Sequence, residues 1–184
     1  MNQKISPNIE FFFEDPSTPP RPRPTNYGVL YLLRRDIITC FDNSAECPGI
    51  MALLAGIDLL GKFYTGNDDP GRGRVGERFI TFLQYFGNIS EREKEVIYQL
   101  RNSLLHSFGL YSEDKNGNIY KFTLGKNFHA FIKQVGDRYY IDVLKLREYF
   151  NLSIENYYKD LKDNIDLQLK FEKMFPRYGA IYMT

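Results

Sequence analysis

Apolar residues recur every three or four positions over four stretches of the first 108 residues, which is the pattern of amphipathic helices. Ser90 and Glu93 have the spacing of a capping box and mark the start of the last of these helices. Asn43 or Ser44 is expected to cap the second. These stretches predict a helical bundle, with helices over residues 27–42, 49–64, 77–86 and 90–108.

After Phe108 the apolar residues no longer recur every three or four positions but alternate with polar residues. Residues 110–112 and 119–124 flank the turn signal Asn116-Gly117, and residues 128–135 and 138–143 flank Gly136-Asp137. Each pair predicts a β-hairpin. Together they predict a small antiparallel β meander over residues 109–143.

The helical period returns at Leu144 and continues to about Phe175. Asn151 suggests a break, with Ser153 as the cap of the last helix. The expected fold class is therefore mainly α (α+β), an antiparallel helical bundle with a β meander before a long C-terminal helix. It is expected to form one domain over 27–184, with a bundle core at 27–108, the meander at 109–143 and C-terminal helices at 144–175.

Residues 1–26 differ from the rest of the chain. Ile9 to Phe13 is an aromatic patch typical of a strand, and Asp15 to Pro24 holds five of the nine prolines. The proline run cannot be helical and predicts an extended leader. It is either a ligand for a proline-binding module or a solvated leader laid across the bundle, and Phe11 to Phe13 favour the second interpretation because they give it a reason to dock.

Composition favours a folded intracellular protein and excludes a broadly basic surface. Hydrophobic residues make up 43% of the 184 positions and the net charge is +1, so any contact with RNA must be local. Cys40 and Cys47 lack neighbours at metal-ligand spacing and are expected to be free thiols. The N-terminus has no signal core and no apolar run approaches about 18 residues, so a cytoplasmic protein without membrane contact is expected.

The loop from Gly66 to Gly76 contains a Gly-x-Gly-x-x-Gly pattern. A dinucleotide fingerprint requires a preceding strand, and here a helix is expected, so a plain interhelical loop is the favoured interpretation. Arg72 and Arg74 in this loop are candidate contacts for an RNA backbone.

Two charged residues lie among the apolar positions of the predicted helices. Arg101 falls inside the stripe formed by Ile97, Leu100, Leu104 and Phe108, and Asp58 lies at the edge of the second helix's stripe. Buried charges need partners, so we expect Asp58 and Arg101 to pair across the bundle. Arg34, Arg35 and Asp36 are expected on a solvated face, and Gly56 and Gly61 should let another helix approach closely.

The polar residues near the end of the fourth helix carry a resemblance. Arg101, Asn102 and His106, with four residues between the Arg and the His, resemble the motif of HEPN (higher eukaryotes and prokaryotes nucleotide-binding) domains, many of which are metal-independent endoribonucleases. The resemblance covers Tyr27 to about Phe108. It implies Arg101, Asn102 and His106 as catalytic residues, and the expected pair with Arg101 makes Asp58 a supporting residue of the site.

The chemistry implied by this resemblance is attack of the ribose 2′-hydroxyl on the adjacent phosphate. An imidazole accepts a proton near neutral pH, and a guanidinium grips phosphate oxygens. No cofactor or metal is expected. His129 is expected to be a surface or packing residue.

Arg101 and His106 lie about 140° apart on a straight helix, which favours a homodimer that combines two copies of the motif. The leading hypothesis is a ribonuclease of toxin or defence type that acts on RNA, and the sequence leaves open whether an antidote protein exists. The alternative is a catalytically inactive HEPN-like module that binds nucleotides or proteins or serves for dimerisation.

Overall fold

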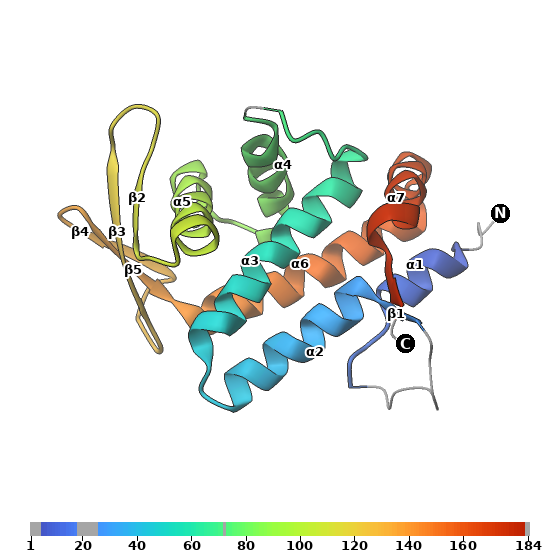
Figure 1. Cartoon of the computed structure of the whole chain (residues 1–184), viewed down its shortest axis with the longest axis horizontal. Coiled ribbons are helices and arrows are strands. Elements are labelled where there is room, and N and C mark those ends of the chain that lie inside the picture. The colour runs from blue at the N-terminus through green and yellow to red at the C-terminus, as the bar shows by residue number, and fades with distance from the viewer. Residues whose placement is uncertain (1–4, 18–25, 72, 183–184) are drawn as a thin grey trace.

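The computed structural model describes residues 5–17, 26–71 and 73–182, and within them the chain is a mixed α/β protein dominated by helices (Figure 1). This confirms the helix-rich class predicted from the sequence. The helices are α1 (Pro7–Phe12), α2 (Val29–Asp42), α3 (Glu46–Thr65), α4 (Arg74–Phe82), the 3₁₀ turn η1 (Leu83–Phe86), α5 (Glu91–Ser107), α6 (Val143–Asp163) and α7 (Ile165–Tyr178). The strands are β1 (Asn26–Gly28), β2 (Tyr111–Glu113), β3 (Ile119–Gly125), β4 (Ile132–Val135), β5 (Arg138–Asp142) and β6 (Ala180–Tyr182).

Helix α3 is the centre of the fold, with α2, α4, α5, α6 and α7 packed around it (Figure 1). Two glycines allow this close packing, as the sequence predicted. A Cβ at Gly56 would lie 2.6 Å from side-chain atoms of both Leu33 and Phe150, and one at Gly61 would lie 2.9 Å from the Arg78 carbonyl oxygen. Larger residues there would push α2, α6 or α4 away from α3.

The beginnings of α2 and α3 differ from the sequence expectation. Tyr27 belongs to β1, which pairs antiparallel with β6. Helix α3 begins at Glu46 rather than Gly49, with Ala45 at the cap position and Ser44 in a left-handed conformation (φ 57°), so neither Asn43 nor Ser44 caps it. Pro48 fits inside the first helical turn because N–H groups there have no partner within the helix.

The N-terminal segment is helical over Pro7–Phe12, so the strand expected at Ile9 to Phe13 is wrong. Ser6 caps α1 by accepting a hydrogen bond from the Asn8 N–H at 3.2 Å. Ile9 and Phe12 are fully buried in the main core. The expected docking is confirmed, and it occurs through a helix because one face of α1 can then bury two apolar side chains three positions apart, Ile9 and Phe12. Most of the proline run, residues 18–25, lies outside the described residues.

Both hairpins form, but the expected antiparallel meander is wrong because the strand order is β2-β3-β5-β4. β3 and β5 pair in parallel, which places Tyr120 beside Tyr139 with ring centroids 5.5 Å apart. The most deeply buried strand residues lie on β3 and β5, whereas β4 is largely exposed. Placing the two apolar strands together at the centre gives one continuous buried face, and polar β4 takes the edge. β4 begins at Ile132, so His129 lies in an exposed loop instead of a strand.

The C-terminal helices divide at Asn164, not near Asn151. Helix α6 passes through Asn151 and through Ser153, whose hydroxyl donates to the Phe150 carbonyl at 2.7 Å instead of capping a new helix. The buried stripe of α6 continues without a change of phase, which keeps the helix intact. Asn164 caps α7 by accepting from the Leu167 N–H, and the buried face of α7 is formed by Leu167, Phe171 and Met174.

Helix α3 also has the length and mean hydropathy of a membrane-crossing helix. Half of the apolar window is buried inside the fold, as in a central bundle helix, and the window includes Asp58 and Lys62. Cys40 and Cys47 are free thiols, as expected.

Candidate functional site

Helix α5 carries the motif and has well-defined ends. The predicted capping box is confirmed: Ser90 Oγ accepts from the Glu93 N–H at 3.2 Å, and Glu93 Oε2 accepts from the Ser90 N–H at 2.8 Å. The other end is closed by Phe108 in a left-handed conformation (φ 48°). Phe108 is 70% exposed, so its expected place in the core stripe is wrong.

Asp58 of α3 and Arg101 of α5 form the ion pair predicted from the sequence. Asp58 Oδ2 accepts from Arg101 Nε at 2.8 Å and from Nη2 at 2.5 Å. The two side chains are only 18% and 12% exposed. Burial raises the pKa of Asp58, while the Arg101 cation works against this rise. The pair fixes two of the three guanidinium nitrogens and leaves Nη1 for other contacts.

Arg101 Nη1 reaches both other motif residues within one chain. It donates to Asn102 Oδ1 at 3.2 Å and lies 2.6 Å from His106 Nε2. A guanidinium only donates hydrogen bonds, so Nε2 is the acceptor and the neutral His106 ring carries its proton on Nδ1. The helical-wheel separation of about 140° is therefore bridged by the length of the arginine side chain, so contact between the two groups does not require a second subunit.

The three motif side chains differ in exposure to solvent. Arg101 is nearly buried, Asn102 is half-buried and His106 is exposed in the last turn of α5. A basic group held by the core thus touches an imidazole that solvent or a substrate can reach. This arrangement suits proton transfer next to a fixed positive charge.

A cleft of about 600 Å³ opens on the Asp58 and Arg101 side of the motif. Four of its lining residues are cations, of which Lys62, Arg78 and Arg177 were missed by the sequence reasoning, and two are carboxylates. The lining residues are Asp58, Lys62, Asp68, Pro70, Val75, Arg78, Arg101, Arg177 and Tyr178.

Each missed cation is held in a different way. Lys62 Nζ lies 4.1 Å from the ring centre of Tyr178, the Arg78 guanidinium is buried and donates to the Asp69 carbonyl, and Arg177 donates to Asp68 at 2.7 Å. Lys62 is four residues after Asp58, so helical spacing could have indicated it. Arg177 comes from α7, and nothing in the sequence links it to α5.

Of the two arginines of the glycine-rich loop expected to contact RNA, the structure describes only Arg74 and does not bring it to the cleft. Arg72 lies outside the described residues. Arg74 opens α4, forms exposed ion pairs with Glu77 at 3.2 Å and Asp69 at 4.0 Å, and is not among the cleft-lining residues. The loop follows helix α3, so it lacks the strand that a dinucleotide fingerprint requires.

Asp68 forms hydrogen bonds with two other residues of the cleft lining, Arg177 and Tyr178. These bonds predict how the stability of the fold changes at acid pH. The Asp68 carboxylate accepts from Arg177 at 2.7 Å and from Tyr178 at 2.9 Å, and these bonds lower the pKa of Asp68 below its ordinary value of 3.8. A folded pKa below the unfolded one stabilises the fold above about pH 4, and this stabilisation is lost as the pH falls. We expect Asp68→Asn to reduce the loss of unfolding free energy between about pH 7 and pH 3 in urea denaturation. An unchanged pH dependence would contradict this.

Comparisons with known proteins found no match: no family model, curated protein or solved structure matches this chain. Among the described residues, no group of three His, Cys, Asp or Glu side chains gathers as a metal site. The resemblance to HEPN domains therefore depends on Arg101, Asn102 and His106 and on their helix.

Proposed function

We propose that this protein is a metal-independent endoribonuclease of HEPN type, with Arg101, Asn102 and His106 as its catalytic residues. The observation that carries the proposal is the 2.6 Å contact between Arg101 Nη1 and His106 Nε2, with Arg101 held by Asp58. It joins a proton acceptor and a fixed cation on an accessible helix end. Those are the two groups that cleavage by a ribose 2′-hydroxyl requires.

The proposed reaction begins when a phosphate of the substrate replaces His106 as a partner of Arg101 Nη1. The neutral imidazole then accepts the proton of the 2′-hydroxyl through Nε2, and the 2′-oxygen attacks the adjacent phosphorus. The bond to the 5′-oxygen breaks, leaving a 2′,3′-cyclic phosphate and a 5′-hydroxyl that takes up a proton. Arg101 stabilises the negative charge that develops on the phosphate, and Asn102 orients Arg101 or donates to the phosphate.

The basic cleft supports a role in holding RNA. Lys62 and Arg177 line it beside Arg101, and Arg177 is largely exposed. With a net charge of only +1, the protein lacks a broad electrostatic footprint, so a local group of cations suits a short length of single-stranded backbone.

We further propose a homodimer formed through the surface next to the motif. Phe108, Leu110 and Tyr111 follow α5 directly, and all three are exposed. Neighbouring exposed aromatic and aliphatic side chains are typical of interfaces. Each subunit would then hold its own Arg101 and His106, and the dimer would place two such sites near each other.

The second candidate is an inactive HEPN-like module that binds nucleotides or proteins or dimerises. It is favoured by the fact that Arg101 already has partners in Asp58, Asn102 and His106, so the motif could serve only to fasten α5 to α3. RNA cleavage separates the two candidates.

The test is incubation of purified protein with generic single-stranded RNA in EDTA. We expect cleavage by the wild type, 2′,3′-cyclic phosphate ends, and a loss of about 10²-fold or more in Arg101→Ala, since transition-state charge stabilisation is worth that much. Arg35→Ala is the control, because Arg35 is an exposed cation paired with Asp36. Circular dichroism establishes that both variants fold. Absence of cleavage by a stable wild-type dimer would support the module instead.

A toxin or defence role in the cytoplasm follows from the same proposal. Expression of the wild type should slow bacterial growth, whereas His106→Ala should not. Rescue of growth by a co-expressed antidote protein would extend the proposal to a toxin and antidote pair. Equal growth with both forms would contradict the toxin role.

A further inference from the structure

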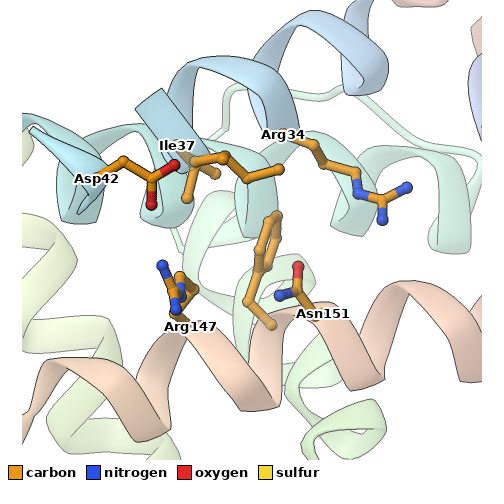
Figure 2. Close-up of a pocket in the computed structure, with 7 residues that line it drawn as sticks. Arg34, Ile37, Asp42, Arg147 and Asn151 are labelled. Atoms are coloured by element: carbon orange, nitrogen blue, oxygen red, sulfur yellow. The ribbon is translucent and has the colours of Figure 1, made fainter. Parts of the chain in front are cut away.

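A second cavity lies between α2 and α6 and shares no lining residue with the cleft beside Arg101. Its volume is about 290 Å³, near the lower end of the range of small-molecule sites, about 300–1,000 Å³. Figure 2 shows Arg34 and Asn151 toward one end and Asp42 and Arg147 toward the other. The lining residues are Arg34, Ile37, Ile38, Asp42, Arg147, Phe150 and Asn151.

Arg34 is partly buried, and one of its hydrogen-bond donors has no partner in the part of the chain that the structure describes. The sequence suggested a solvated face for residues 34–36, and this holds for Arg35 and Asp36, which are exposed and paired at 2.8 Å. Arg34 is only partly exposed, and its Nε is buried without a hydrogen-bond partner. Burial lowers the pKa of Arg34, although the charges of Asp15 and Glu155 oppose this. A buried donor without an acceptor is costly, and an oxygen of a bound ligand would relieve the cost.

Arg147 adds a second guanidinium to this cavity, which we call the α2–α6 groove. It lies 4.8 Å from the ring centre of Phe41. Among the described residues neither Arg34 nor Arg147 forms an ion pair within 4.0 Å, whereas Arg35, Arg74, Arg101 and Arg177 all do. With Asp42 as the one carboxylate among the lining residues, the lining itself holds two positive charges and one negative charge.

The remaining surface of the groove is apolar. Ile37 and Phe150 are almost completely buried and Ile38 is exposed at the rim. A ligand that fits must therefore combine an anionic head with an apolar body of about the size of one ring.

We propose that the α2–α6 groove binds a small organic phosphate. The phosphoryl group accepts hydrogen bonds from Arg34, including its buried Nε, and from the Asn151 amide. The apolar body packs on Ile38 at the rim, toward Arg147. Arginine is suited to this role because its planar donors match phosphate oxygens in pairs.

The test is calorimetric titration of the whole protein with phenyl phosphate, inorganic phosphate and benzyl alcohol. Phenyl phosphate should bind saturably and more tightly than inorganic phosphate, and benzyl alcohol should not bind. Arg34→Gln should weaken phenyl phosphate binding by about tenfold or more, because hydrogen bonds to charged groups are strong. Arg35→Gln, on the next residue of the same helix, should leave the affinity unchanged.

Further variants keep the test decisive. If Arg34→Gln does not fold, Asn151→Asp places a repelling charge at the same end of the groove and should also weaken binding. Equal binding in Arg34→Gln and Arg35→Gln, or no saturable binding by the wild type, would overturn the proposal.

Discussion

Replacement of His106 by alanine is expected to reduce RNA cleavage by about 10²–10⁴-fold, which is the usual contribution of a positioned general base. His106 is exposed at the end of α5 and touches the protein through Arg101 Nη1, so its removal leaves the Asp58–Arg101 pair in place. RNA affinity and melting temperature should therefore change little. Cleavage of a fluorescently labelled RNA in EDTA, followed with time, measures the effect.

The sequence supplies a matched control, because His129 is its only other histidine. His129 is exposed in the loop before β4, and its carbonyl oxygen, not its ring, accepts from Lys145 at 2.9 Å. His129→Ala should cleave RNA at the wild-type rate. If the two variants lose activity equally, or His106→Ala retains it, His106 is not the base.

Replacement of Phe12 by alanine is expected to lower the free energy of unfolding by about 3–5 kcal/mol, as for other large buried aromatic residues. Phe12 is 0% exposed, and its ring centre lies 4.5 Å from that of Phe63 and 5.3 Å from that of Phe171. Removing the ring would leave a cavity between α1, α3 and α7. Denaturation in urea measures the loss, which is a large share of the stability of an ordinary domain.

Phe11 provides the comparison for this variant. It neighbours Phe12 on the same short helix but is only partly buried, with its ring 6.3 Å from that of Phe175. Phe11→Ala should therefore cost clearly less. Similar small losses for both variants would mean that the N-terminal segment is a solvated leader after all, and that α1 contributes little to the core.

Local patterns predicted much of the helical framework. The capping box at Ser90 and Glu93 and the turns at Asn116-Gly117 and Gly136-Asp137 each involve residues close in sequence, and all three form. The Asp58–Arg101 pair was also predictable, since each charge stood at an apolar position and needed a partner. The helix break predicted at Asn151 and Ser153 was wrong, because residues that favour caps are also tolerated inside a helix whose apolar stripe continues.

What the sequence by itself determined is which side chains prefer burial, where most helices and hairpins form, and that Arg101, Asn102 and His106 share one helix end. Tertiary structure alone decided that β3 lies beside β5, that α1 closes the core, and that Arg177 of α7 joins Lys62 and Arg101 at one cleft. It also brought Arg101 Nη1 to His106, since the reach of a long side chain depends on the rotamer that Asp58 imposes. The physical reason is that periodicity records the direction of each side chain from its own helix axis, whereas contacts between elements depend on how all the apolar faces are buried at once.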